Sequence, residues 1–306
     1  MKRPTWLPYL GLTLTVLFWS GNFILGRGIR QFIPPVSLNF WRWVGALLIL
    51  LPFGWAKIMG EKDLYLRHWK MLTLMSIPSI AIFNAFIYTA LQTATAINTV
   101  LVNAMIPIFI ALAAWLVFSD RLSPRQTSGV CISFVGMLFI VTRGDLRLLG
   151  KLDFSTGDLW TLGASLSWAI YSVMLRKRPK EMDPIAFLTL IVGIGLIFSL
   201  PVYLWELKNQ GGFSLTPTNL ASLAYVALFP SVLSFIFWNY GVDKVGANRA
   251  GIFIHLMPVF SIVLAILFLG ERMRGFHVGG MLLIFSGIVL TTLKTPNGEH
   301  PTSNIE

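Results

Sequence analysis

The chain has 306 residues, of which 55% are hydrophobic and only 12% are charged. Soluble domains carry about 25% charged residues, so half that share is too small to cover a surface that faces water. A soluble enzyme, a nucleic-acid-binding module and a disordered scaffold are therefore disfavoured, and the net charge of +11 is better explained by membrane loops kept on the cytoplasmic side.

Ten apolar runs follow one another along the chain. A membrane-spanning helix needs about 20 largely apolar residues. The runs lie at 7–25, 36–56, 69–92, 95–118, 125–142, 158–175, 184–205, 218–240, 247–269 and 276–293. The first is too long for the apolar part of a signal peptide, and no small-residue cleavage site follows it, so we expect a retained helix. The remaining connections are too short for an extramembrane domain.

Lysine and arginine counts predict the orientation. With the N-terminus inside, fifteen of the 24 Lys and Arg residues lie on the inner side and eight on the outer side, and Arg42 lies within the second span. Positive residues are retained in the cytoplasm, so both termini are predicted to be cytoplasmic. With no organelle signal in the sequence, we expect the inner (plasma) membrane of a bacterium.

The sequence also contains a weak internal repeat. At an offset of 149, Trp19, Arg27 and Pro35 meet identical residues; at 151, Ala96, Pro107, Arg121, Gly129 and Gly136 do so, and Asp120 meets Glu271. Each half contains five spans, and because five is odd the second half enters from the opposite side. Inverted repeats allow a transporter to alternate access around a site at their interface. We predict an all-α membrane protein with ten transmembrane helices as two inverted five-helix repeats, 1–143 and 157–293, around a central cavity, followed by a cytoplasmic tail, 294–306.

Several of these residues together resemble the EamA-type members of the drug/metabolite transporter superfamily. They are Trp19, Pro35, Arg42, Pro107, Pro258, Asp120-Arg121-Leu122 and Gly270-Glu271-Arg272. Asp120 departs from the pattern, because such proteins more often have Glu there. The resemblance covers both halves and implies a ten-helix protein that exports small metabolites, commonly amino acids, with the first, third and fourth helices of each repeat lining the centre.

Polar side chains inside the spans are the candidates for the substrate site, because a polar group in lipid is costly. Ser76, Asn84, Tyr88 and Gln92 are separated by multiples of four and so follow one helix face. The predicted substrate-binding residues are Trp19, Ser20, Asn84, Tyr88, Asn103, Trp168, Ser172, Trp238, Asn239 and His255. Hydrogen bonding between helices is the alternative role, and it is the favoured one for any single Ser or Thr.

Three other features have two interpretations each. Pro107 and Pro258 fall inside repeat-related spans, where they predict hinges or static kinks. Arg42 could bind a substrate carboxylate, or it could reach the interface or a helix end in a structural role. The glycines of the last span form a small-residue face for a contact within the chain or for a dimer seam.

The predicted function is export of aromatic or large hydrophobic amino acids through the central cavity. All Asp and Glu residues lie in loops, tails or helix ends, and only His255 could titrate at mid-depth, so transport should be facilitated or weakly proton-linked. A multidrug or cation exporter would need a buried acid, and a nucleotide or phosphate-ester exchanger several buried bases; both remain alternatives. We expect no enzyme activity, cofactor, metal or nucleic acid. The expected partners are a small-molecule substrate and lipid, with a monomer favoured and a dimer possible.

Overall fold

The computed structural model describes residues 5–94, 96–151, 155–269 and 272–293, and within these ranges it contains helices and no strand. The predicted all-α class is therefore confirmed. The tail 294–306 and the Gly270-Glu271 pair lie outside the described residues.

The helices of the first half follow the predicted spans. They are α1 (Leu7–Ile29), α2 (Pro35–Gly60), α3 (Lys62–Arg67), α4 (Trp69–Ser76), η1 (Ile77–Ile82), α5 (Phe83–Thr93), α6 (Ala96–Asn103), α7 (Ile106–Phe118) and α8 (Pro124–Val141). The short α3 lies outside the predicted spans, and the third and fourth spans are each built from more than one element.

The helices of the second half also follow the predicted spans, with three 3-10 segments, η2, η3 and η5, among the described elements. They are η2 (Leu146–Lys151), α9 (Thr156–Met174), η3 (Leu175–Lys177), α10 (Pro184–Gln210), α11 (Pro217–Ala227), η4 (Leu228–Leu233), α12 (Ser234–Val245), α13 (Ala247–Gly251), η5 (Ile252–Leu256), α14 (Met257–Leu269) and α15 (Gly275–Thr292).

Local sequence signals explain several helix ends. Pro35 and Pro184 occupy the first positions of α2 and α10, where the missing N–H of proline removes no helical hydrogen bond. The carboxylate of Asp183 accepts hydrogen bonds from the N–H groups of Ile185 and Ala186 and so caps α10. Gly246 directly follows α12 and adopts a φ of 84°, a conformation that favours glycine where a helix ends.

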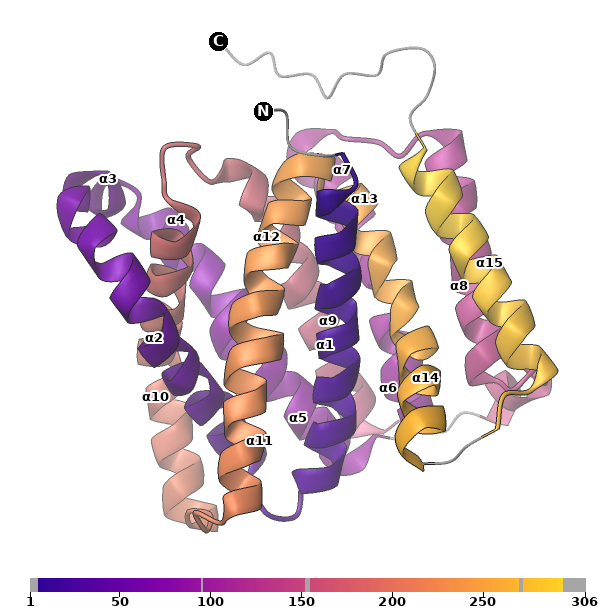
Figure 1. Cartoon of the computed structure of the whole chain (residues 1–306), viewed down its shortest axis with the longest axis horizontal. Helices are drawn as coiled ribbons and strands as arrows, with labels where there is room; N and C mark the ends of the chain where they lie inside the picture. The colour runs from indigo at the N-terminus through magenta and orange to yellow at the C-terminus, as the bar shows by residue number, and fades with distance from the viewer. Residues whose placement is uncertain (1–4, 95, 152–154, 270–271, 294–306) are drawn as a thin grey trace.

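Nine helical segments within the described ranges are long and apolar enough to cross a membrane. The sixth predicted span, α9, is not one of them. It lies inside the bundle, where it packs against α5, α6 and α7 (Figure 1). A helix covered by protein on several sides does not need an apolar surface, so α9 can carry more Ser, Thr and Gly than its neighbours. Its crossing remains a prediction.

The two halves pack against each other through pairs of elements at corresponding positions in the sequence. The fifth spans of the two halves, α8 and α15, lie side by side, and so do the second spans, α2 and α10 (Figure 1). In the same way α1 packs against α12 while α9 packs against α5. These pairings are the ones expected from a two-fold axis between inverted repeats.

Irregular turns also recur at the repeat offset. The π-helical segments η1 and η4 cover 77–82 and 228–233, which are 151 residues apart. Pro107 follows a break between α6 and α7, and Pro258 follows the 3-10 segment η5. The prolines therefore lie in the first turn of a new helix, where no hydrogen bond is lost. Their role as hinges remains a prediction.

Glycines bring α8 and α15 into close contact. A Cβ atom at Gly129 would lie 2.6 Å from the carbonyl oxygen of Gly287, and one at Gly136 would lie 2.7 Å from that of Gly280. Small residues allow two helix backbones to approach closely in a membrane. Gly280 and Gly287 therefore serve a contact within the chain, which was one of the two roles expected for the last span.

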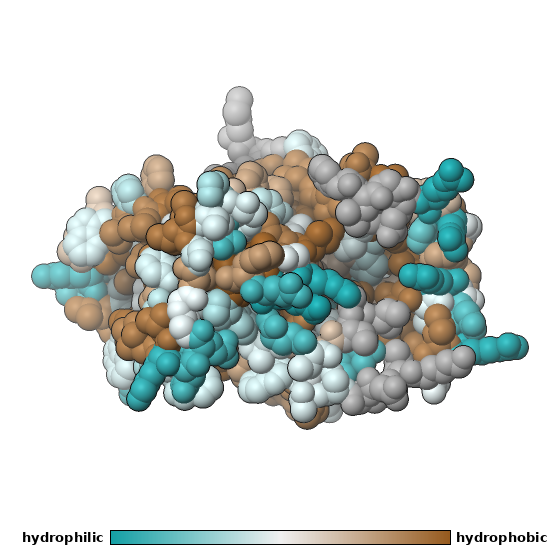
Figure 2. Space-filling model, turned by 90° about the horizontal axis from the view of Figure 1, so that it is seen from below, coloured by the Kyte–Doolittle hydropathy of each residue, from teal (hydrophilic) through white to brown (hydrophobic). Residues whose placement is uncertain are grey.

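The two ends of the bundle differ from its sides in the residues that they expose. Figure 1 places the start of α1 and the end of α15 at the same end of the bundle. Figure 2 shows the opposite end, where hydrophilic side chains gather among hydrophobic ones. Exposed large apolar residues such as Leu48, Phe53, Leu116 and Ile197 lie along the helices. This distribution suits a protein whose sides contact lipid and whose ends contact water.

Candidate functional site

Three tryptophans meet at the centre of the bundle. Trp19 of α1 lies 4.9 Å from Trp168 of α9 and 5.2 Å from Trp238 of α12, measured between ring centroids. Trp168 and Trp238 are 5.4 Å apart. All three side chains are buried. The structure therefore brings together the three predicted tryptophans, and the repeat-related pair Trp19 and Trp168 makes an edge-on contact between the halves.

Other aromatic rings complete this cluster, and the sequence analysis missed them. Phe83 and Phe235 contact Trp168 at centroid distances of 4.9 and 5.3 Å, and Tyr171 contacts it at 5.3 Å. Phe83 precedes Asn84 and Phe235 is four residues from Asn239, but apolar residues are common in these spans and give no signal of their own. We call Trp19, Phe83, Trp168, Tyr171, Phe235 and Trp238 the aromatic cluster.

The indole N–H groups of the cluster differ in their partners. Trp238 donates to Ser172 Oγ at 3.2 Å, and Trp19 donates to the Pro230 carbonyl oxygen at the same distance. The N–H of Trp168 is buried and has no acceptor among the described residues. A buried donor without a partner is unfavourable, and the group is available to a ligand.

A second group of buried residues surrounds Arg42 of α2, which is 1% exposed. Its Nε donates to Ser231 Oγ at 2.8 Å. Its Nη1 donates to Asn84 Oδ1 at 2.8 Å and to the Tyr88 hydroxyl at 2.7 Å, with Asn22 Oδ1 at 3.5 Å. We call these five residues the arginine network. The Arg42 side chain is buried and does not extend to the surface, while its choice between a structural role and substrate binding stays a prediction.

The arginine network contains one of two repeat-related hydrogen bonds. The Tyr88 hydroxyl donates to Asn22 Oδ1 at 2.6 Å, and the Tyr171 hydroxyl donates to Asn239 Oδ1 at 2.7 Å. At the repeat offsets Asn22 corresponds to Tyr171, and Tyr88 to Asn239. The same bond therefore occurs in both halves with its residue types exchanged, a relation that no comparison of identical residues could find.

The remaining predicted residues lie near the breaks at the two prolines. Asn103 accepts a hydrogen bond from Ser165 Oγ at 3.2 Å, while its own Nδ2 has no acceptor among the residues that the structure describes. It lines a hollow of about 30 Å³ with Phe23, Met137 and Pro258. Such a volume holds about one water molecule.

His255 is fully buried, and the protein already engages both of its ring nitrogens. Nε2 donates to the Ala104 carbonyl oxygen at 2.9 Å, which identifies the tautomer because a carbonyl only accepts. Nδ1 lies 2.6 Å from Ser133 Oγ. Ser20 likewise donates to backbone carbonyls, those of Val16 and Met257. The hydrogen bonds and the ring contact of His255 in the described chain, to Ser133, Ala104 and Phe134, include no residue of the arginine network or the aromatic cluster.

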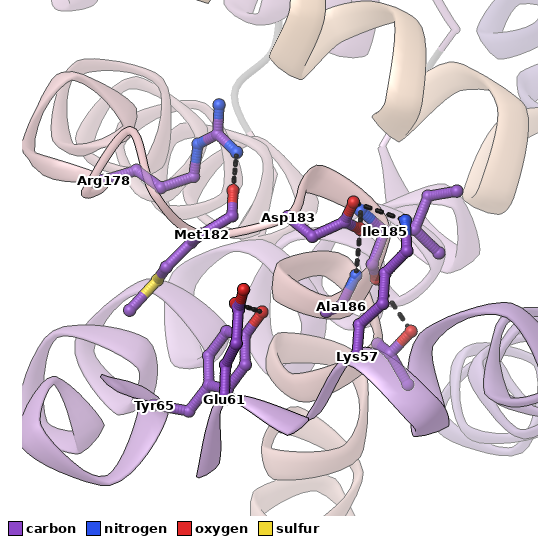
Figure 3. Close-up of polar contacts among 9 residues, drawn as sticks. Lys57, Glu61, Tyr65, Arg178, Met182, Asp183, Ile185 and Ala186 are labelled. Carbon is purple, nitrogen blue, oxygen red and sulfur yellow. Dashed lines mark hydrogen bonds and ion pairs between the residues drawn. The ribbon is translucent and has the colours of Figure 1, made fainter. Parts of the chain in front are cut away.

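A larger hollow of about 540 Å³ lies at one end of α2 and α10, away from the aromatic cluster. Figure 3 shows the side chains there: Lys57 reaches the carboxylate of Asp183, and Glu61 lies beside the Tyr65 hydroxyl. Partial burial raises the pKa of Asp183, but the hydrogen bonds from Lys57, Ala186 and Ile185 outweigh this effect and bring the pKa below its ordinary value. Burial and the charge of Glu61 raise the pKa of Tyr65.

The opposite end of the same helix pair holds a buried acid. Glu206 of α10 accepts hydrogen bonds from the N–H groups of Val36 and Ser37 and from the Ser37 hydroxyl, at 2.6 to 2.9 Å. It lies at a helix end, as expected, yet it is only 1% exposed. Glu206 corresponds to Lys57 at the repeat offset of 149. Each end of the α2–α10 pair is thus held by a carboxylate at a helix N-terminus.

Comparisons with known proteins give the family. The EamA-like transporter family matches twice, at residues 6–142 and 155–293. An uncharacterized transporter of Archaeoglobus fulgidus is 28% identical over 94% of this chain and 97% of its own. A probable amino-acid metabolite efflux pump of Salmonella typhimurium is 26% identical over 90% of this chain and 92% of its own. One crystal structure shares the fold with a TM-score of 0.72 at 18% identity, over 93% of this chain and 96% of that one.

Proposed function

Because this chain belongs to the EamA-like transporter family, we propose that it exports small metabolites, foremost aromatic or large hydrophobic amino acids, by alternating access between two inverted five-helix repeats. The relative from Salmonella typhimurium, a probable amino-acid metabolite efflux pump, supports this substrate class. The membrane is the bacterial inner membrane, with both termini in the cytoplasm.

The observation that carries the proposal is the position of the aromatic cluster beside the arginine network. Trp19 and Trp168 meet at the contact between the halves, and Phe83 joins the cluster to Asn84 in the next position. Aromatic faces suit an apolar side chain, and convergent hydroxyl, amide and guanidinium groups suit a polar head. The nearby hollow of about 30 Å³ is too small for an amino acid, so binding requires the halves to separate.

Two kinds of irregular segment in this fold suit a movement that separates the halves. The π-helical segments and the breaks at Pro107 and Pro258 recur at corresponding positions, and such irregular turns frequently accompany functional movement in membrane helices. We propose that these segments bend while the glycine contact between α8 and α15 stays closed.

Transport is proposed to be facilitated or weakly proton-linked. Among the described acids, the two most buried, Asp158 and Glu206, bind helix starts rather than the central groups. Proton and sodium relays generally use an intramembrane carboxylate. His255 is bonded to Ser133 and to the Ala104 carbonyl oxygen rather than to the arginine network.

The test is flux of labelled L-phenylalanine in proteoliposomes of the purified protein. We expect counterflow that persists without a pH or sodium gradient, because the substrate gradient supplies the drive. Trp168→Ala should lower this flux at least about tenfold through loss of a stacking surface, while the exposed Leu48→Ala should not. Absence of flux for phenylalanine and for other hydrophobic amino acids would contradict the proposal, and absolute dependence on an ion gradient would contradict the facilitated mechanism.

A further inference from the structure

Arg42 is a buried charge that no described carboxylate neutralises. It lies about 10 Å along α2, seven residues after the start of the helix at about 1.5 Å per residue. A guanidinium keeps its proton in proteins, so the positive charge is present even when the side chain is buried. All four of its hydrogen-bond partners, Asn22, Asn84, Tyr88 and Ser231, are neutral.

The buried acids in the described ranges are engaged elsewhere. Glu206 binds the N-terminus of α2 through Val36 and Ser37. Asp158 binds Asn98 and Ser155. None of the ion pairs formed by described residues includes Arg42. A buried charge is normally paired, because an unpaired one is costly. Arg42 has no such partner among the described residues, so its site can accept a negative group.

The second half of the protein shows that the fold does not require this charge. At the repeat offsets Arg42 corresponds to Ile191, and Asn84 corresponds to Phe235. Ile191 and Phe235 are buried apolar residues. The repeat-related Tyr171–Asn239 bond forms without any guanidinium beside it. The charge is therefore a feature of one half only, as a site for an asymmetric ligand would be.

Unpaired hydrogen-bond donors at the centre lead to the same conclusion. Trp168 Nε1 and Asn103 Nδ2 are buried without acceptors among the described residues. No acceptor of the arginine network or the aromatic cluster is left buried and unpaired in the described chain. A ligand that satisfies this site must supply acceptors.

We propose that Arg42, with Asn84 and Tyr88, binds the carboxylate of the substrate while the aromatic cluster holds its ring, so that the site selects aromatic monocarboxylates of net negative charge. This rests on the proposed function and extends the substrates of the same site from amino acids to aromatic monocarboxylates without an ammonium group. A zwitterionic amino acid can bind through its carboxylate, but its ammonium group finds no acid. A cation meets Arg42 directly and is repelled. A doubly charged phosphate ester would keep one charge unpaired.

Three ligands with the same ring and nearly the same length separate these cases. Phenylpropionate is an anion, L-phenylalanine a zwitterion and phenethylamine a cation at neutral pH. In calorimetric titrations of the purified full chain, we expect phenylpropionate to bind at least as tightly as phenylalanine, and about tenfold or more tighter than phenethylamine, because hydrogen bonds to charged groups are the strong ones. Tighter binding of phenethylamine or of phenyl phosphate than of phenylpropionate would overturn the proposal.

Asn84→Asp tests the missing counter-ion with almost no change in shape. It places a carboxylate where the amide oxygen now lies 2.8 Å from Arg42 Nη1. We expect the melting temperature to hold or rise and the affinity for phenylpropionate to fall about tenfold or more, since the resident acid now neutralises the guanidinium. The same substitution at Asn219, which is buried in the first turn of α11, is the control and should leave affinity unchanged. Unchanged affinity in folded Asn84→Asp protein would overturn the proposal.

Flux gives a second readout that separates this proposal from the proposed function. Net export of a monoanion moves charge, so a potassium diffusion potential of 100 mV, negative inside, should change accumulation of phenylpropionate about 50-fold. If phenylalanine is bound and transported while phenylpropionate is not bound, the proposed function stands and the anion site is wrong. If phenylpropionate is bound and no amino acid is transported, the anion site stands and amino-acid export is wrong.

Discussion

At the scale of single residues, the tyrosine of the arginine network and its counterpart in the second half differ in their partners. Both tyrosines donate to an asparagine, but only Tyr88 also accepts from a guanidinium. Hydrogen bonds to charged groups contribute more than neutral ones. The two tyrosines therefore form a natural pair for measuring what Arg42 adds.

Tyr88→Phe should cost about 1.5 to 3 kcal/mol of unfolding free energy, because it removes a bond to a buried charge. Tyr171→Phe should cost about 0.6 kcal/mol, the average for a neutral bond between membrane helices. Thermal unfolding in one detergent checks the difference. Equal losses of unfolding free energy in the two variants would mean that the hydrogen bond between Arg42 and the Tyr88 hydroxyl adds no stability.

Asp183 should make stability depend on pH. Its pKa is lowered in the folded state, so its contribution is present above the ordinary aspartate pKa of about 4 and is lost as the pH falls through the lower folded value. Asp183→Asn keeps a capping side chain but loses the charge, so we expect a loss of about 0.2 to 1 kcal/mol at neutral pH that shrinks below pH 4, because the pair is partly exposed.

The measurement is the melting temperature of wild type and Asp183→Asn between neutral pH and about pH 3. Asp63→Asn, on the exposed face of α3, is the matched control and should follow wild type throughout. A gap between wild type and Asp183→Asn that grows on acidification would contradict the assigned direction of the shift.

At the scale of elements, contacts between α8 and α15 decide how closely the halves approach. The contact is reciprocal: Gly129 faces Gly287, and Gly136 faces Gly280. At the offset of 151 Gly129 corresponds to Gly280, and Gly136 to Gly287. A two-fold axis between antiparallel helices requires this crossed pairing.

Gly129→Ala should therefore destabilise the protein by about 1 to 3 kcal/mol, as overpacking against a backbone does. The new methyl group would lie 2.6 Å from the carbonyl oxygen of Gly287, which cannot rotate away. Gly193→Ala in α10 is the control, because its methyl group would meet nothing within 4 Å. Thermal unfolding of the two variants checks the comparison; a tolerated Gly129→Ala would show that the helices can separate at no cost.

At the scale of the whole molecule, the first and last helices place the start of α1 and the end of α15 at the same end of the bundle. The start of α1, the α2–α3 turn and the end of α15 share one end of the bundle, and the end of α10 lies at the other (Figure 1). From the excess of Lys and Arg at the first end we predict that this end faces the cytoplasm.

Labelling of single cysteines tests this topology. After Cys131, which is exposed, is replaced by alanine, cysteines at Thr5, Lys62 and Leu293 should react with an impermeant maleimide only in inverted vesicles. A cysteine at Asn209, which is exposed near the end of α10, should react only in intact cells. Labelling of positions 5 and 293 from different sides would rule out inverted repeats.

The sequence by itself determined the class of the protein, the apolar spans and the offset that relates Trp19 to Trp168, because hydropathy and spacing are properties of the chain alone. It also placed Asn84, Tyr88 and the three tryptophans among the candidates. It could not show that Arg42 meets Ser231, 189 residues away, or that Asn22 and Tyr171 occupy corresponding places. Only the tertiary structure decides such contacts, since whether a buried charge has a partner depends on which helices face each other, and that is fixed by the packing of all the spans together.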